Sequence, residues 1–255
     1  MEAVQLTVAS FNIRKAIGTD RKRDPQRILD VLSEIGPDII ALQEADKRVG
    51  TRGAAVPHNL IDEHGQWQAI DFDVRHPKLL DLLPDHNLTR PLLERLDTRN
   101  LGWHGNAILV RRDVDVMHAQ ALDLPTLEPR GAVMAELRTA SGPIRAIGMH
   151  LDLSGLYRLR QVEAIIAAIK AREPMPTVIM GDTNEWSTGP NCLDAFLPRF
   201  RTCSVLPTYH SRKPVASLDR IFIDRAIDIE DHGVHRSALA HAASDHLPIW
   251  ARLKL

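Results

Sequence analysis

Residues 177–186, TVIMGDTNEW, join a short apolar run to a polar segment. The run TVIM at 177–180 has the length and the β-branched composition of a strand. Asp182 and Asn184 follow at the carboxyl end of that strand. Because a single Asp or Asn at a strand end usually caps a turn, the segment alone predicts only a strand. The chemical role of Asp182 and Asn184 depends on which other residues of the chain lie beside them.

Seven further apolar runs of strand length are distributed along the 255 residues. No shift in composition marks a linker between them, so we expect a single domain that spans residues 1–255. Its predicted class is mixed α/β, rich in strands. The runs are VQLTV at 4–8, DIIAL at 38–42, NAILV at 106–110, AVMAEL at 132–137, IRAIGM at 144–149, RIFI at 220–223 and PIWARL at 248–253.

Two helices are indicated by their caps and by their apolar spacing. Asp24 is the expected N-cap of the first helix, Pro25 its first residue, and Gly36 its end. The second helix is expected from about residue 156 to about residue 171. Apolar spacing predicts the buried faces, which are Ile28, Val31, Leu32 and Ile35 in the first helix and Leu159, Val162, Ile165, Ile166 and Ile169 in the second.

The stretch 73–102 is the least regular part of the sequence. It holds three prolines and several charged residues, and we expect a long excursion with a short helix near 92–96. Long loops in compact domains are often lids or specificity loops. A solvated surface insertion is an equal alternative.

Polar residues recur where the predicted strands end or begin. Glu44 follows DIIALQ, His150 follows IRAIGM, and Asp219 precedes RIFI. Ligand sites gather at one edge of a sheet, where strands end, so these groups are expected to converge. The full set is Asn12, Glu44, His150, Asp182, Asn184, Asp219, Asp245 and His246.

Eight segments carry a further pattern: SFNI at 10–13, LQEAD at 42–46, WHGNAILV at 103–110, EPRGA at 128–132, MHLD at 149–152, GDTNEW at 181–186, SLDRIFI at 217–223 and SDHLPIW at 244–250. In these segments, and in their order, the sequence resembles the endonuclease/exonuclease/phosphatase superfamily of DNase I-like phosphoesterases. The resemblance covers nearly the whole chain. It implies an α/β (α+β) fold of two packed, mostly antiparallel β-sheets flanked by helices, a four-layer αββα sandwich with the site at one rim.

The resemblance also implies a divalent metal, Mg²⁺, with Mn²⁺ as a possible substitute. Glu44 is the expected principal ligand, since Mg²⁺ typically takes one or two carboxylates together with waters and substrate oxygens. Asn12 is expected beside it, as an orienting donor or an outer ligand. Asp245 is a further candidate ligand, directly or through water, or else a support for the ligands.

Cleavage of a phosphate ester also requires an activated water and donors for the developing charge. His246 is the expected general base or transition-state stabiliser, and Asp219 is expected to fix its tautomer. Asp182 is expected to orient the attacking water, and Asn184 to donate to a phosphoryl oxygen. Asp245, which adjoins His246, belongs to the same expected catalytic group.

Three more residues are expected to hold the phosphate. His150 is a candidate donor to a non-bridging oxygen. Asn106 and Arg130 are candidate phosphate-binding residues, and the arginine offers a fork that matches phosphate oxygens. For Arg130, a structural ion pair with Glu128 or another acid is the alternative.

The expected activity is hydrolysis of a phosphate ester by a Mg²⁺-dependent phosphodiesterase. The alternatives are a nuclease acting on DNA or RNA, including the abasic-site type, and a phosphomonoesterase. An inactive relative that serves as a binding or scaffold module is a distant further alternative. The substrate is a small molecule, a lipid headgroup or a nucleic acid, and no protein partner can be inferred.

The charge balance bears on the choice of substrate. The chain has 32 basic and 33 acidic residues, a formal net charge of -1, and 4% aromatic residues. A protein that grips long nucleic acid usually has a basic excess and stacking platforms. These values disfavour a non-specific nuclease, although Arg21, Lys22 and Arg23 form a local basic patch.

Cys192 and Cys203 are too few for a disulfide framework and are expected to be ordinary thiols in a reducing compartment. The amino terminus does not have the pattern of a signal peptide. No apolar run approaches the ~20 residues of a membrane span. The expected location is the cytoplasm, with no membrane span.

Overall fold

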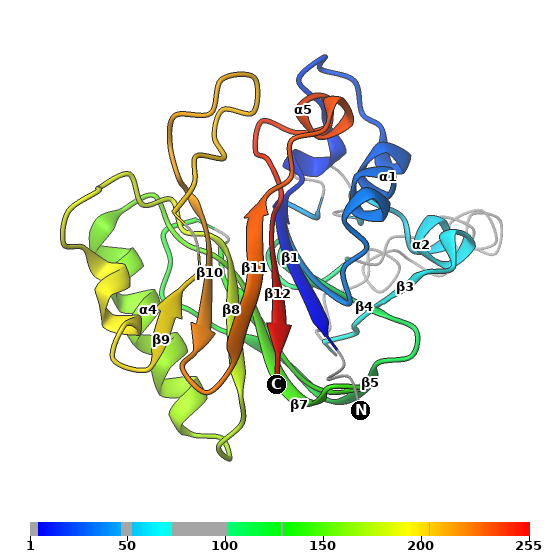
Figure 1. The fold of residues 1–255 in the computed structure, drawn as a ribbon. Helices are drawn as coiled ribbons and strands as arrows, with labels where there is room; N and C mark the ends of the chain where they lie inside the picture. Colours follow the sequence, from blue (N-terminus) through cyan, green and yellow to red (C-terminus); the bar gives the residue numbers. More distant parts are fainter. Residues whose placement is uncertain (1–4, 47–52, 73–100, 129, 204) are drawn as a thin grey trace, which may run out of the picture.

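The computed structural model describes residues 5–46, 53–72, 101–128, 130–203 and 205–255. The expected excursion at 73–102, with its helix near 92–96, lies outside the described residues as far as residue 100. Two six-stranded β-sheets pack face to face, and helices cover their outer faces (Figure 1). This arrangement confirms the predicted four-layer αββα sandwich.

The first sheet contains the strands β1 (Leu6–Asn12), β2 (Ile39–Gln43), β3 (Trp67–Ala69), β4 (Ala107–Arg111), β11 (Asp228–Val234) and β12 (Ile249–Lys254). Their order across the sheet is β11-β12-β1-β2-β4-β3. Among these strands β1 and β2 are parallel, and every other neighbouring pair is antiparallel.

The second sheet repeats this plan with β5 (Asp115–Leu122), β6 (Ala132–Thr139), β7 (Gly142–His150), β8 (Thr177–Asp182), β9 (Phe200–Thr202) and β10 (Asp219–Asp224). Their order is β5-β6-β7-β8-β10-β9. The parallel pair is β7 and β8, and the remaining neighbours are antiparallel. Each sheet thus has one parallel pair at its centre.

Each parallel pair is joined by a helix, because parallel neighbours need a long crossover connection. The helix α1 (Pro25–Ile35) connects β1 to β2, and α4 (Gly155–Lys170) connects β7 to β8. Contacts between β2 and β7 and between β1 and β8 place the two parallel pairs against each other. The centres of the two sheets therefore form the middle of the sandwich.

Apolar side chains form one core between the sheets and one on each outer face. The inter-sheet core includes Ile108 of β4 and Val133 of β6, both fully buried. On the first sheet, α1 packs with α2 (His58–His64) and α5 (Ala238–Ala243), and on the second, α4 packs with η3 (Cys192–Phe196). None of the described helices is long and apolar enough to cross a membrane.

The first helix begins and ends where the sequence predicts. The Asp24 side chain accepts a hydrogen bond from the backbone N–H of Arg27 at 3.1 Å, and Pro25 is the first helical residue. Gly36 ends the helix with a left-handed φ of 64°, which glycine adopts without a steric penalty.

The second helix is confirmed, but its predicted buried face is wrong at Leu159, which is 39% exposed. The buried stripe instead includes Arg158 and Gln161. Arg158 donates to the Glu185 carboxylate, and Gln161 accepts a backbone N–H. Since hydrogen-bonded polar groups can be buried at little net cost, apolar spacing alone could not locate this face.

Gly181 of the GDTN motif lies where β8 pairs with β7. It is opposite Met149 in the parallel register, and its φ is +156°. A Cβ atom at this position would lie 1.8 Å from the Met149 carbonyl oxygen, well inside van der Waals contact. The glycine therefore lets β7 and β8 approach each other closely at the residue just before Asp182.

Gly181→Ala should lower the free energy of unfolding by about 2 kcal/mol or more, because the added methyl group combines a disfavoured φ with a backbone clash. Urea denaturation of the wild type and the variant measures this change. Gly142→Ala is the matched control, because Gly142 also has a positive φ but nothing lies within 4 Å of its Cβ position. Equal losses in the two variants would contradict the clash.

Candidate active site

The carboxyl ends of the two parallel pairs meet at one rim of the sandwich, the upper end in Figure 1. Asn12 ends β1, Asp182 ends β8, and Asn12 Nδ2 donates to Asp182 Oδ2 at 2.9 Å. Strands antiparallel to these begin at the same rim. Accordingly β10 begins at Asp219, and His246 precedes β12. Strand direction thus gathers side chains that lie far apart in the sequence.

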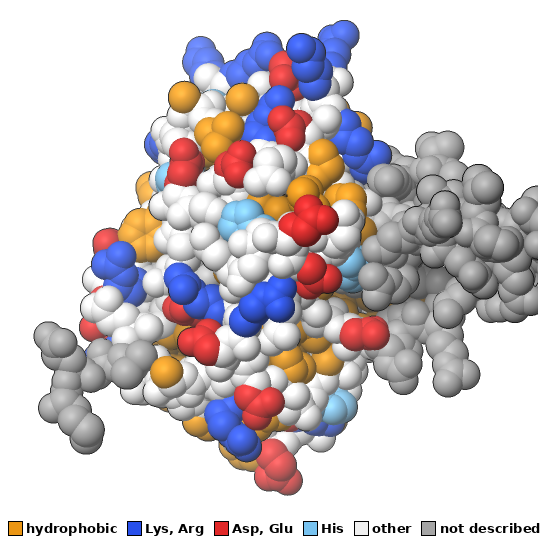
Figure 2. Space-filling view, turned by 90° about the vertical axis from the view of Figure 1, so that its right-hand side faces the viewer, with side chains coloured by type: hydrophobic (Ala, Val, Ile, Leu, Met, Phe, Trp, Pro, Cys, Tyr) orange, Lys and Arg blue, Asp and Glu red, His pale blue; other side chains and the backbone are white. Residues whose placement is uncertain are grey.

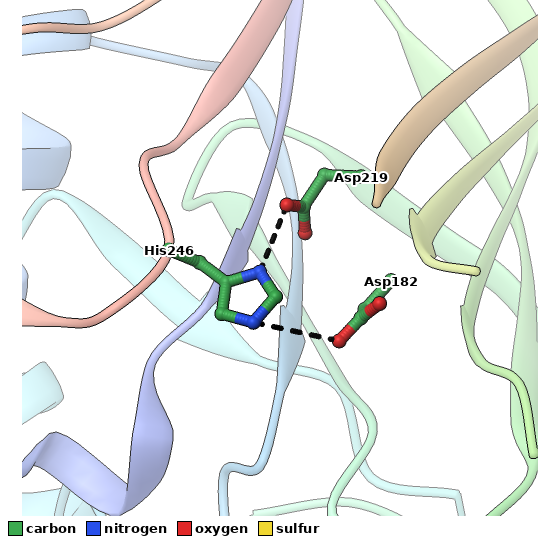
Figure 3. Close-up of side chains that lie close together, drawn as sticks. All are labelled: Asp182, Asp219 and His246. Carbon is green, nitrogen blue, oxygen red and sulfur yellow. Dashed lines mark hydrogen bonds and ion pairs between the residues drawn. The ribbon is translucent and has the colours of Figure 1, made fainter. Parts of the chain in front are cut away.

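Asp182, Asp219 and His246 form the buried centre of this rim (Figure 3). His246 Nδ1 lies 2.9 Å from Asp219 Oδ2, and His246 Nε2 lies 3.8 Å from Asp182 Oδ2. Thr208 Oγ1 also donates to Asp219 Oδ2, at 2.5 Å. The other oxygen, Asp219 Oδ1, is buried with no hydrogen-bond partner among the described residues.

The imidazole between the two carboxylates is held in its charged form. Burial lowers the pKa of His246, but the negative charges of Asp219 and Asp182 raise that pKa more strongly, to about 10. Burial raises the pKa of Asp182, yet the charge of His246 and the hydrogen bond with His150 bring it below its ordinary value. At neutral pH an imidazolium therefore faces an ionised Asp182.

His150, at the end of β7, lies between Asp182 and Arg130. Its Nε2 is 3.4 Å from Asp182 Oδ2 and also contacts Arg130 Nη1. Since one ring nitrogen cannot both donate and accept, these two contacts exclude each other. Arg130 Nε lies 3.1 Å from Glu128 Oε2, so the ion pair that the sequence left as an alternative is present together with the contact to His150.

Asn184 holds Asp182 in place through its backbone. Its N–H donates to Asp182 Oδ1 at 2.9 Å, while its side chain donates to the Leu151 carbonyl at 2.9 Å. The expected donor to a phosphoryl oxygen is thus bonded to the main chain in this structure. The φ of Asn184 is +48°, a left-handed conformation that is uncommon outside glycine and that clusters at functional sites.

Glu44 and Asp245 each pair with a basic residue of one short turn, η1 (Arg14–Ala16). Lys15 Nζ lies 2.5 Å from Glu44 Oε2, and Arg14 Nε lies 3.3 Å from Asp245 Oδ2. Neither basic residue was predicted as a site residue from the sequence. Their position directly after SFNI was the signal that could have indicated them.

Asn106 is linked to the site through the EPRGA segment. It is fully buried, and its Nδ2 donates to the Gly131 carbonyl at 3.0 Å. The same carbonyl accepts the backbone N–H of His150. Asn106 Oδ1 is buried without a hydrogen-bond partner in the described part of the chain. The geometry therefore supports a positioning role for Asn106 beneath His150.

Thr208 and Tyr209 are further site residues that the sequence analysis missed. Thr208 bonds Asp219, and the Tyr209 ring centroid lies 5.0 Å from that of His246. The ring of Trp186, which is 59% exposed, packs edge-on against Tyr209 at 5.7 Å. Thr208 and Tyr209 lie in no predicted strand or motif, so their role depends on tertiary contacts that the sequence does not reveal.

Two sets of residues are candidates to hold a divalent cation. The ligand atoms of Asp182, Asp219 and His246 lie within 4.8 Å of one another, but both ring nitrogens of His246 already face carboxylate oxygens, Nδ1 that of Asp219 and Nε2 that of Asp182. Glu44, Asp245 and Asn12 offer the oxygen donors that Mg²⁺ prefers, and all three contact the turn η1. By the chemistry of their donor atoms, the residues of the second set match Mg²⁺.

Residues 9–246 match the model of the Endonuclease/Exonuclease/phosphatase family. The chain belongs to this family. Its members are hydrolases that act on phosphate esters and generally use a divalent metal. No curated protein matches the sequence.

Solved structures of this family share the fold with the chain at low sequence identity. A Bacteroides vulgatus endonuclease/exonuclease/phosphatase is 17% identical, with a TM-score of 0.71 over 99% of both chains. A humanized D. rerio TDP2 is 15% identical, with a TM-score of 0.70 over 98% of this chain and 99% of its own. The human Nocturnin catalytic domain is 17% identical, with a TM-score of 0.68 over 98% and 93%.

The ion pairs of His246 should make stability depend on pH. An unfolded histidine titrates near pH 6.5, and His246 titrates at about 10. The contribution is therefore complete below about pH 6.5 and is lost as the pH rises to about 10. The difference in unfolding free energy between wild type and His246→Gln should shrink across this range, as urea denaturation at about pH 6, 8 and 10 can show. A difference that stays constant or grows would contradict the charged pairing.

Proposed function

We propose that the chain is a Mg²⁺-dependent phosphodiesterase. The observation that carries this proposal is the buried series Asp182, His246 and Asp219 at the rim where both parallel pairs end. Hydrolysis of a phosphate ester requires positive charge against the phosphoryl oxygens and an anionic group beside the attacking water. An imidazolium next to an ionised carboxylate meets both requirements.

The proposed reaction joins a water oxygen to phosphorus while the bond from phosphorus to the leaving oxygen breaks. Asp182, which Asn12 and Asn184 hold in place, is proposed to orient the water and accept its proton. His246 already carries its proton, so we assign it to stabilise the developing negative charge and not to act as a base. Asp219 fixes its ring through Nδ1.

Glu44, Asn12 and Asp245 are the proposed metal ligands. Bound Mg²⁺, or Mn²⁺ in its place, would supply a Lewis acid that polarises a phosphoryl oxygen. We propose that His150 and Arg130 bind the non-bridging oxygens, because His150 Nε2 lies 3.4 Å from Asp182 Oδ2 and Arg130 lies against the same ring. In this role Arg130 donates to the substrate and not to His150.

A nuclease is the second candidate, and the surface charge favours it. Lys and Arg side chains gather at the upper end of the molecule, where α5 and the loop after β1 lie (Figures 1 and 2). Arg212 Nη2 joins two of the loops there by donating to the Thr19 carbonyl at 2.7 Å. The exposed basic residues of these loops are Arg21, Lys22, Arg23, Arg212 and Lys213.

The related structures do not distinguish a nuclease from a phosphodiesterase that acts on another substrate. One D. rerio TDP2 structure contains a single-strand DNA product and has a TM-score of 0.69. A Bacteroides thetaiotaomicron mannosyl-6-phosphatase has a TM-score of 0.65. Both are below 20% identity to this chain, and they support a phosphate-ester substrate without defining the group that carries the phosphate.

We also propose that residues 1–255 form one catalytic domain that works in the cytoplasm. The shared inter-sheet core and the family match across residues 9–246 support the single domain. The free thiols of Cys192 and Cys203 are consistent with a reducing compartment.

The proposal predicts metal-dependent turnover on a panel of phosphate esters: bis-p-nitrophenyl phosphate, p-nitrophenyl phosphate, a glycerophosphodiester and single-stranded DNA. Activity should appear with added Mg²⁺ or Mn²⁺ and disappear with chelator. Glu44→Gln should lower kcat/KM by about 10²-fold or more, the scale of losing one electrostatic stabiliser. Glu63→Gln on the exposed face of α2 is the control. Turnover that is unaffected by chelator, or a Glu44→Gln variant with wild-type rates, would contradict the metal assignment.

A further inference from the structure

The turn η1 places a basic side chain against both acidic residues proposed as metal ligands. Lys15 Nζ is 2.5 Å from Glu44 Oε2, and Arg14 Nε is 3.3 Å from Asp245 Oδ2. The backbone N–H of Arg14 donates to Asn12 Oδ1 at 3.1 Å. One three-residue turn therefore contacts the whole proposed ligand set.

The backbone of this turn adopts an unusual conformation. Arg14, Lys15 and Ala16 have φ values of 46°, 58° and 60°, in the left-handed region that non-glycine residues rarely occupy. Main-chain hydrogen bonds hold it there, including Lys15 N to the Glu44 carbonyl at 3.0 Å and Ile17 N to the Arg14 carbonyl at 3.0 Å. These hydrogen bonds of the turn do not involve the side chains of Arg14 and Lys15.

The two ion pairs are partly shielded from solvent. The side chains of Lys15 and Glu44 are 21% and 19% exposed, and those of Arg14 and Asp245 are 38% and 19% exposed. Charges in such positions are screened less than charges on the open surface. A divalent cation and an ammonium group that approach the same carboxylate oxygen repel each other, so they compete for it.

A cation released from its carboxylate in this rim has an alternative partner. In the proposed reaction the substrate phosphate lies against Asp182 and His246. The turn η1 is linked to this place through Asn12, which accepts the Arg14 N–H and donates to Asp182. Lysine and arginine are both common phosphate-binding residues. After a metal has bound to the carboxylate partner of Arg14 or Lys15, that side chain could pair with a phosphoryl oxygen.

We propose that Lys15 and Arg14 are exchangeable counter-ions, which pair with Glu44 and Asp245 until a divalent cation takes those carboxylates and then bind the non-bridging oxygens of the substrate phosphate. This inference rests on the proposed metal-dependent hydrolysis. The exchange makes metal binding and phosphate binding depend on each other. The metal releases the cation that binds phosphate, and the phosphate holds that cation away from the carboxylate that binds the metal. By linkage, the metal and the phosphate must strengthen each other's binding by the same factor.

Lys15→Met tests the exchange, since methionine keeps an unbranched side chain of nearly the same length and removes its charge. Without phosphate, the variant should bind Mn²⁺ about fivefold or more tightly than the wild type, at the lower end of typical coupling between sites. With Mn²⁺ present, it should bind inorganic phosphate more weakly than the wild type by a similar factor. Isothermal titration calorimetry measures both affinities without relying on turnover.

Lys254→Met is the matched control, because Lys254 is an exposed lysine at the end of β12 that lies away from the rim. It should leave both affinities at wild-type values. The same changes in affinity are expected for Arg14→Met, which removes the second ion pair. This second variant keeps the inference testable if Lys15→Met fails to fold. A gain in metal affinity is also a change that general structural damage would not produce.

The outcomes separate this inference from the proposed function. If the wild type binds Mn²⁺ and neither Lys15→Met nor Arg14→Met binds it more tightly, the exchange is overturned, the ion pairs only brace the rim, and the proposed function stands. If the wild type does not bind Mn²⁺ at all, the proposed metal-dependent function fails and the exchange fails with it. Tighter Mn²⁺ binding together with weaker phosphate binding in the variants supports the exchange.

Discussion

The Asp182 carboxylate is the group on which the arrangement of the rim depends. It accepts hydrogen bonds from Asn12 at the end of the first sheet and from the backbone of Asn184. His150 and His246 lie 3.4 Å and 3.8 Å from the same carboxylate. A buried charge without partners is strongly destabilising. The four residues that contact Asp182 must therefore stay close to its carboxylate. They tie the two sheets to each other at the edge where the site lies.

The local backbone is shaped to make this convergence possible. Gly181 lets β8 approach β7 more closely than any side chain would allow. Glu44 and Asn184, at the ends of β2 and β8, have positive φ values, as does the turn of Arg14 and Lys15. Each of these positions stores local strain that the surrounding packing must compensate. Their concentration at one rim is the expected signature of a site selected for chemistry at the expense of stability.

The interior of the fold could be predicted from the sequence, and its periphery could not. All eight predicted strands are present, because each is a run of apolar residues buried in the middle of a sheet. The four missed strands, β3, β5, β9 and β11, are the edge strands of the two sheets. Edge strands bury less apolar surface and are often short or charged, so their pattern is weak. At the site, the motifs located Asp219 and His246, whereas Lys15 and Thr208 owe their positions to loop packing.

The proposed mechanism depends most on the charge state of His246 between Asp219 and Asp182. Nitrogen NMR of protein labelled with ¹⁵N-histidine, recorded near pH 7.5 and assigned with His246→Gln, reports this state directly. We expect both ring nitrogens of His246 to carry a proton, as the raised pKa requires. A neutral ring with one protonated nitrogen at that pH would contradict it, and would return His246 to the role of a general base.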